Sequence, residues 1–363
     1  MKLKSSKNQT WLISTWFSEG AYSQVQLRVI KDAAISGIDS KTTCISTMAI
    51  KSDTKYAVHD SIAQAIYEVD LENTTPPKLL TLGSHRLDDT CHIYVKGSMT
   101  VVIRCGYPIL FSISGETAVI KSVGLFRNRK CKNDALITNR WSQQRGDMIY
   151  FVDSDDDLCY IRWREIERFN VTVKMTAFTQ VEDFFAAEND EIAVIHLDGR
   201  LSLPMDKKID LTKIKDNVGW SIVIKISSKW LVCGDANGKA TLALIGESGR
   251  VNSVVSQTLT TNGYVAENSE YSVNTSMYCM KVVEQKKDRA LVLAIERDCY
   301  CHLVAYYYPD NLVRLDTFSM ISRSEVNMVK SEKVILSITK TNKDNEFIAT
   351  GIHWVKIFTL KLK

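Results

Sequence analysis

The strongest constraint on the fold of this chain is a recurring pair of short apolar runs joined by a polar or glycine-containing turn. The runs are rich in Val, Ile, Thr, Tyr, Phe and Trp and are bounded by Gly, Asn, Asp and Ser, which is typical of β-hairpins. Successive hairpins begin about 40 to 60 residues apart, a spacing that suits a four-stranded repeat unit with variable loops. The seven hairpins span residues 56–71, 99–114, 148–163, 192–203, 230–245, 290–307 and 347–362.

The rest of the chain gives no reason to divide it. Helical periodicity is almost absent, the sequence contains only 5 prolines, and no low-complexity linker interrupts it. Closed β folds of this length often form one domain. We therefore expect a single all-β domain over residues 1–363, with a flexible N-terminus at 1–10 and a long loop at 262–276.

Two hairpin turns and one strand show a more specific pattern. Asp198-Gly199 and Asn237-Gly238 tolerate positive φ at both central positions of a type I′ turn, which matches the twist of paired strands. The second arm of the last hairpin reads V-K-I-F-T-L at residues 355–360 and alternates apolar with exposed positions.

This arm resembles the third blade strand of the WD40 family, which reads approximately V-K-I-W-D-L after a turn of the x-D-G type. Phe358 stands at the Trp position of that pattern and Thr359 at its Asp position. The family's Gly-His dipeptide is missing, and no Trp-Asp pair occurs in the chain. The resemblance implies a single β-propeller of seven four-stranded blades, with six and eight blades as the alternatives.

The propeller also predicts how the two ends of the chain meet. A four-stranded blade cannot bury both faces alone, so neighbouring blades stack around an axis and radial closure leaves only short edges. In the WD40 family a strand from one terminus often completes the blade of the other. Residues 24–30 alternate as a strand does, and we expect them to pair beside residues 354–362 and to close the propeller.

Composition limits the classes of function. Lys and Arg exceed Asp and Glu by four, giving a net charge of +4, so binding to nucleic acid or anionic lipid would need a local patch. Most of the 9 cysteines lie in apolar runs, as expected of a protein in a reducing compartment. We expect neither a signal peptide nor a membrane span, and a cytoplasmic or nuclear location.

Three clusters contain residue types that can bind metals or react. Residues 85–92 combine His, Asp and Cys, residues 153–157 are mostly Asp, and Cys299 and Cys301 share one face of a strand. The spacings fit neither an EF-hand nor a C-x-x-C pair. We interpret the three as an inter-blade loop, a hairpin turn and blade packing, and predict no metal, no cofactor and no catalytic residue.

Partner-binding residues are expected in the connections between blades. Arg127, Arg129, Lys130, Lys132, Arg140 and Arg145 form the densest basic segment, and Tyr264 and Tyr271 lie in the long loop. Arg and Tyr are frequent energetic anchors at protein interfaces. By the geometry of the WD40 family, the inter-blade connections and the turns within the hairpins lie on one face. We expect the partner on that face.

These observations favour a non-catalytic protein-interaction scaffold, a β-propeller subunit of a larger complex whose partners are other protein subunits. The first alternative is a propeller that binds nucleic acid or phosphoinositide through the basic segment 127–145. The second, ranked last, is a propeller enzyme that gathers carboxylates or histidines at its axis. The sequence contains no G-x-S-x-G, P-loop or G-x-G-x-x-G motif to favour that second alternative.

Overall fold

The structure is a computed structural model. It describes residues 10–13, 25–32, 45–70, 76–80, 91–97, 99–104, 110–114, 117–121, 142–153, 155–168, 172–187, 189, 191–236, 239–258, 277–296, 300–319, 335–351 and 354–362. The chain divides into two compact units, of which unit 1 is Met1–Thr176 with Arg323–Lys363 and unit 2 is Ala177–Ser322. The expected loop 262–276 lies outside the described residues, as does the segment 1–10 apart from Thr10.

The described part of unit 1 forms three four-stranded sheets and one five-stranded sheet, all antiparallel. The first sheet is β3 (Ile45–Ile50), β4 (Lys55–Asp60), β5 (Ala65–Asp70) and β6 (Lys78–Leu80). The second is β7 (Cys91–Lys96), β8 (Met99–Arg104), β9 (Leu110–Ser114) and β10 (Thr117–Lys121). The third is β11 (Ser142–Arg145), β12 (Met148–Val152), β13 (Leu158–Arg162) and β14 (Lys174–Met175), with α1 (Trp163–Glu167) after β13. The five-stranded sheet is β1 (Thr10–Ile13), β2 (Val25–Asp32), β29 (Trp354–Leu362), β28 (Glu346–Gly351) and β27 (Ile335–Lys340).

The described part of unit 2 forms three four-stranded antiparallel sheets. The first is β15 (Val181–Ala186), β16 (Ile192–His196), β17 (Arg200–Leu203) and β18 (Lys207–Asp210), followed by a 3₁₀ turn, η1 (Leu211–Lys213). The second is β19 (Gly219–Ile226), β20 (Lys229–Ala236), β21 (Lys239–Ile245) and β22 (Val251–Thr258). The third is β23 (Met277–Gln285), β24 (Arg289–Glu296), β25 (Tyr300–Tyr307) and β26 (Asn311–Ser319).

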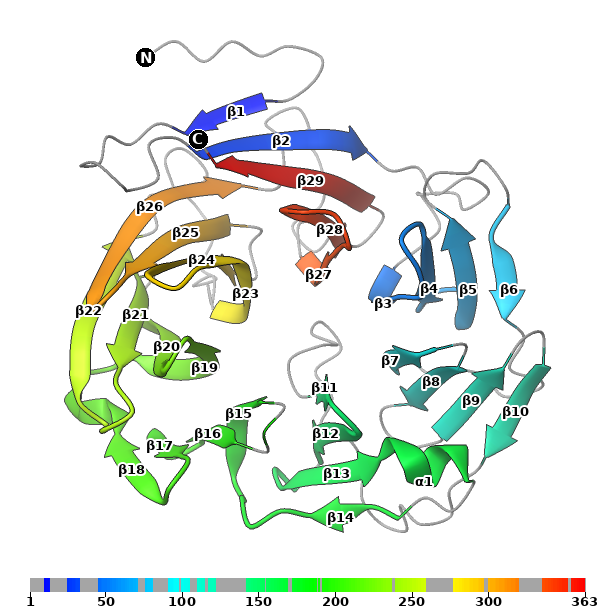
Figure 1. Ribbon diagram of the computed structural model, residues 1–363, viewed down its shortest axis with the longest axis horizontal. Coiled ribbons are helices and arrows are strands. Elements are labelled where there is room, and N and C mark those ends of the chain that lie inside the picture. Colours follow the sequence, from blue (N-terminus) through cyan, green and yellow to red (C-terminus); the bar gives the residue numbers. More distant parts are fainter. Residues whose placement is uncertain are drawn as a thin grey trace, which may run out of the picture. The chain divides into compact units, whose positions relative to one another are not determined.

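The hairpins predicted from the sequence are confirmed. Each of the seven becomes the second and third strand of a different sheet, for example β16 with β17 and β20 with β21 (Figure 1). The four-stranded repeat is present in six of the sheets formed by the described residues, and the seventh sheet has β1 as a fifth strand. Antiparallel neighbours joined by short turns explain why the hairpin signal is so strong in the sequence.

The sheets of unit 2 stack face to face, and strand β20 shows why its sequence is apolar at consecutive positions. Trp230 and Val232 pack with residues of β16 and β17. Leu231 and Cys233 point the other way and pack with residues of β23 and β24. Because successive side chains of a strand lie on opposite faces, a sheet covered on both sides buries consecutive residues of its central strands, here 230–234 of β20. The first strands β15, β19 and β23 also contact one another in turn.

One turn differs from the sequence prediction. We expected positive φ at both Asp198 and Gly199, but in the structure φ is +79° at Gly199 and is not positive at Asp198. The turn runs from His196, whose carbonyl accepts the Gly199 N–H at 2.9 Å. This is a three-residue connection in which Gly199 takes the left-handed position after the turn. The second predicted turn, Asn237-Gly238, lies outside the described residues.

The N-terminal strand pairs with the C-terminal strand as the sequence predicted. Strand β2 is antiparallel to β29, with Val25 opposite Leu362 and Asp32 opposite Lys356. A register shift lies between Val29 and Lys31. The pairing joins segments from the two ends of the chain within unit 1. That this pairing closes the propeller stays a prediction.

Candidate functional site

Most of the residues that the sequence proposed for partner binding lie outside the described residues: Arg127, Arg129, Lys130, Lys132, Arg140, Tyr264 and Tyr271. Arg145 is described. It ends β11, is half-buried, and its Nη1 donates to the carbonyl of Gln144 at 3.0 Å. The structure therefore leaves the proposed basic surface untested, and it stays a prediction.

The acidic segment 153–157 forms a tight turn around one buried carboxylate. Asp153 is fully buried, and its Oδ1 accepts the backbone N–H groups of Asp155 at 3.0 Å and Asp157 at 2.9 Å. Its Oδ2 lies 3.6 Å from the Sγ of Cys159. Such local bonds to the backbone are what an Asp at the start of a turn makes. Asp153 thus holds the β12–β13 turn.

The other two clusters are largely outside the described residues. Only the backbone of residues 91 and 92 in β7 belongs to the described part of the segment 85–92, and Cys299 precedes the described start of β25. Within the described segments, no group of three or more His, Cys, Asp or Glu side chains is placed to hold a metal ion.

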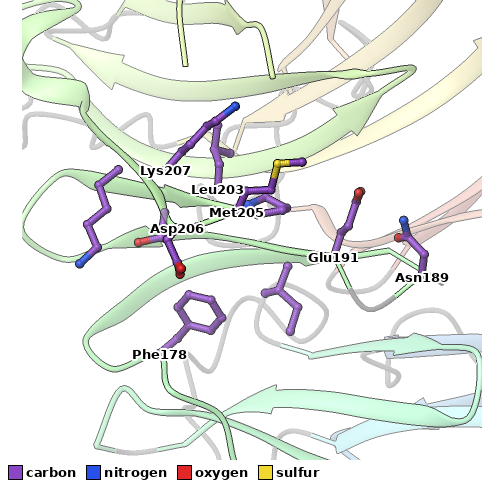
Figure 2. Close-up of a pocket in the computed structure, with 11 residues that line it drawn as sticks. Phe178, Asn189, Glu191, Leu203, Met205, Asp206 and Lys207 are labelled. Carbon is purple, nitrogen blue, oxygen red and sulfur yellow. The ribbon is translucent and has the colours of Figure 1, made fainter. Parts of the chain in front are cut away.

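A hollow of about 320 Å³ opens at one end of the sheet β15–β18. The residues that line it are Phe178, Asn189, Glu191, Ile192, Ser202, Leu203, Pro204, Met205, Asp206, Lys207 and Lys208. Figure 2 shows the ring of Phe178 on one side and Met205 with Leu203 on the other, while Glu191 and Asn189 lie toward one end and Asp206 toward the other. The hollow therefore combines an apolar interior with a charged rim.

The β17–β18 turn builds one wall of the hollow and places an apolar side chain in solvent. Met205 is 84 % exposed, a large value for a methionine. Met205 and Asp206 both have positive φ, 65° and 58°. Positive φ is uncommon for residues other than glycine and is sparsely populated for a long side chain such as methionine. Pairing of Leu203 with Lys207 closes the hairpin around this strained tip.

Ser202, which lines the hollow, is already hydrogen-bonded within the blade. Ser202 is 8 % exposed, and its Oγ lies 2.8 Å from Nε2 of His196. Nδ1 of the same ring lies 2.9 Å from the carbonyl oxygen of Thr179. These bonds join β17, β16 and the segment that precedes β15. We therefore conclude that the Ser202–His196 hydrogen bond stabilises the blade and does not serve a binding function.

At one end of the hollow, Glu191 forms an ion pair with Lys225 of β19. The hydrogen bond from Lys225 lowers the pKa of Glu191 below its usual value, and a bond from Asn189 acts in the same direction. The carboxylate is thus charge-compensated by the neighbouring sheet. Lys225 also lies 5.3 Å from the centre of the Trp230 ring, which fixes the ammonium above β20.

Further hydrogen bonds tie the turns at this end of unit 2 to one another. Nζ of Lys207 donates to the carbonyl of Glu247, in the β21–β22 turn, at 2.7 Å. Nδ2 of Asn252 donates to Asp310, in the β25–β26 turn, at 2.6 Å, and Lys229 forms an ion pair with the same carboxylate. The turns of three consecutive sheets are therefore held in fixed relative positions. Tyr308, 68 % exposed, lies in the last of them.

The sequence analysis predicted partner binding at the opposite end of the sheet. In an antiparallel sheet the β15–β16 and β17–β18 turns lie at one end, and the β16–β17 turn lies at the other. The sequence analysis favoured the end with the hairpin turns and inter-blade connections, whereas most of the lining of the hollow comes from the other two turns and their flanking residues, with Phe178 added from the connection before β15. The one signal for it was an apolar residue, Met205, directly before the charged residues Asp206, Lys207 and Lys208.

Comparison with known proteins places the fold. No protein-family model matches the sequence, and no curated protein matches it. The β-propeller domain of Vanderwaltozyma polyspora Nup133 is similar in structure, with a TM-score of 0.60 and 8% identity over 97% of this chain and 100% of that one. The chain is a β-propeller.

Two other solved structures support the same fold. BBS1N, solved in complex with ARL6DN, has a TM-score of 0.55 and 10% identity over 90% of this chain and 94% of its own. A catalytically inactive virginiamycin B lyase from Staphylococcus aureus, solved with quinupristin, has a TM-score of 0.54 and 8% identity over 93% and 100%. One of these proteins is a lyase and another was solved with a protein partner, so β-propeller similarity at this identity carries no activity with it.

The helical content of this β-propeller is small. In the part of the chain that the structure describes, no helix has the length and apolar character to cross a bilayer. Cys159 and Cys233 are buried, and Cys279 is half-buried.

Proposed function

We propose that this β-propeller is a non-catalytic interaction scaffold, a subunit of a larger complex, and that it binds a partner protein at the hollow of the β15–β18 blade. The observation that carries the proposal is the exposed side chain of Met205 beside the apolar interior of that hollow. Methionine is enriched at protein interfaces, and an apolar centre within a polar rim is the usual anatomy of such a site.

The charges around the hollow support a protein partner in preference to a polyanion. Its lining includes both carboxylates, Glu191 and Asp206, and ammonium groups, Lys207 and Lys208. A surface for nucleic acid or acidic lipid would concentrate one sign of charge. The alternative function through the basic segment 127–145 rests on residues that, apart from Arg145, lie outside the described part of the chain, and it stays a prediction.

The location of the protein forms part of the proposal. Cys159 and Cys233 are buried in their blades, as expected of cysteines that act as small apolar residues in a reducing compartment, which supports a cytoplasmic or nuclear scaffold.

The test compares three forms of the tagged full chain expressed in its native source. These are the wild type, Met205→Ser, and Met175→Ser as a matched control, because Met175 on β14 is also exposed, at 49 %. Co-purified proteins are quantified by mass spectrometry after cross-linking, which also maps links to Lys207 and Lys208. We expect one partner to be depleted about tenfold by Met205→Ser, as for loss of an interface anchor, and retained by Met175→Ser.

Two results would count against the proposal. A partner retained equally by both variants would remove the hollow as its binding surface. A chain that elutes as a lone monomer, without any stoichiometric partner, would remove the scaffold function itself.

A further inference from the structure

We propose that the hollow of the β15–β18 blade receives one bulky apolar side chain from a partner segment, and that this segment carries an acidic residue next to the apolar one. This inference rests on the proposed function and adds the chemistry of the partner to it. It depends on the size of the hollow, on which of its polar groups are already bonded, and on the charges left uncompensated at its rim.

Size and lining favour a side chain over a cofactor. A hollow of about 320 Å³ is at the lower limit of sites that enclose small organic ligands. Phe178, Ile192, Leu203, Pro204 and Met205 supply apolar walls. Burial of one large apolar side chain there would remove its surface and that of the exposed Met205 from water together. Anchors of this kind contribute most of the binding energy in many protein interfaces.

The existing hydrogen bonds of the lining polar groups disfavour a strongly polar side chain in the hollow. The Oγ of Ser202 is engaged by His196, and the carboxylate of Glu191 by Lys225 and Asn189. A polar side chain entering the hollow would lose part of its water and would have to share groups that already have partners. Unpaired buried polar groups are costly, so the interior selects an apolar side chain.

The charges at the rim favour an acidic residue next to that apolar side chain on the partner segment. Lys208 is exposed, and within the described segments it forms no ion pair. The ammonium of Lys207 donates to the carbonyl of Glu247, which holds its position without neutralising its charge. Asp206 is the one lining carboxylate that no cation of the described residues compensates. Two ammonium groups against one carboxylate favour an acidic residue on the segment that docks.

The geometry of the turn fixes these groups before binding. Positive φ at both Met205 and Asp206 directs the turn, and the Lys207–Glu247 bond ties it to the next blade. A turn held in this way loses little conformational freedom when a partner docks.

The experiment selects decamers from a random phage-displayed library on the immobilised full chain. We expect enriched sequences to place Leu, Ile, Met, Phe or Trp within two residues of Asp or Glu. A synthetic peptide of the most enriched sequence is then titrated against four forms of the chain: wild type, Met205→Ser, Lys208→Glu and Asp206→Asn. Thermal melting of each form checks that it is folded.

The expected change in affinity for the peptide differs in direction among the variants. Met205→Ser weakens the acidic peptide about tenfold, as for an anchor contact. Lys208→Glu weakens it about threefold, because it reverses one solvent-exposed charge, and Asp206→Asn strengthens it about twofold, because it removes one. Asparagine tolerates positive φ well, so Asp206→Asn keeps the turn. Higher salt reduces both charge effects.

Failure of this inference is distinguishable from failure of the proposed function. Enriched peptides that pair the apolar residue with Lys or Arg, and still lose affinity in Met205→Ser, overturn the acidic partner but leave the hollow as a protein-binding site. Peptides whose affinity is the same for all four forms bind elsewhere and overturn both. Absence of any enriched sequence also overturns the peptide chemistry, and the co-purification experiment then decides the scaffold function alone.

Discussion

The carboxylate of Asp183 on β15 accepts a hydrogen bond from the backbone N–H of Val223 on β19, with 2.9 Å between Oδ2 and the nitrogen. Asp183 is 4 % exposed, and a register shift lies beside the bond in each strand. Strand β19 is at the edge of its sheet, so one row of its N–H groups faces away from β20. A side chain of one blade thus satisfies a buried backbone group of the next blade.

Removal of this acceptor should destabilise unit 2. Asp183→Ala leaves the Val223 N–H buried without its bond, and we expect the free energy of unfolding to fall by about 2 kcal/mol. Asp183→Asn retains a carbonyl oxygen in the same place and should lose much less. Urea denaturation at pH 7 measures both variants. Equal losses would show that the negative charge, not the acceptor, is what stabilises the contact.

Stability should also depend on pH through His59 on β4. His59 is fully buried, and burial lowers its pKa from 6.5 to about 4. Between these two values the unfolded chain binds more protons than the folded chain, so the free energy of unfolding falls as the pH drops from 6.5 toward 4. The contribution of this group should be about 2 kcal/mol smaller at pH 5 than at pH 7. Urea denaturation at the two pH values provides the measurement.

The matched variant for that experiment is His59→Gln, which has no titratable group at this position. Its stability should change less between pH 7 and pH 5 than that of the wild type, by the amount assigned to His59. A pH dependence that is the same in both proteins would contradict the assignment.

The corrected turn makes a prediction about Gly199. Its φ of +79° disfavours any residue with a Cβ, and a Cβ there would lie 3.0 Å from Cγ2 of Thr212. We expect Gly199→Ala to cost about 1 to 2 kcal/mol of stability. Gly146→Ala is the control, because Gly146 also has positive φ, +52°, but a Cβ would have no atom within 4 Å. If Gly146→Ala were as costly in thermal or urea unfolding, the Thr212 contact would contribute nothing.

The pairing of β2 with β29 predicts the effect of truncating the chain. Deletion of residues 1–32 removes a strand that pairs with β29 from Val25 to Asp32 and exposes its hydrogen-bonding edge. We expect a large fall in the melting temperature. Deletion of residues 1–14 removes only β1, which pairs with Val25 to Arg28 on the outer side of β2, and should have a smaller effect. An unchanged melting temperature after the longer deletion would contradict closure of the propeller by β2.

The strands of this chain were predictable because they carry two local signals. The run from Trp230 to Cys233 is continuously apolar, and Gly199 marks the end of a hairpin turn. Both signals arise from the strand itself or from its immediate neighbour. The details of the turn were less predictable, since Asp198-Gly199 fits more than one turn type and the spacing of the paired strands decides between them.

The hollow could not be predicted, for a different physical reason. Phe178 precedes β15 and Met205 follows β17. The two residues line the same hollow only because the folded sheet brings these separate segments together. The turn that carries Met205 has positive φ without a glycine, so it lacks the usual sequence mark. The basic and tyrosine residues expected to bind partners lie mostly outside the described residues, and that part of the sequence prediction remains to be tested.

The burial of β20 on both faces determines which substitutions its sequence tolerates. A strand enclosed between two neighbouring sheets needs apolar side chains that fill the available volume, and Val, Ile and Leu exchange there at modest cost when volume is kept. Substitutions can therefore accumulate through the blades while the stacking persists. Two chains can therefore share the β-propeller fold over 97% of this one with only 8% identity between them, because the stacking needs apolar volume and not particular residues.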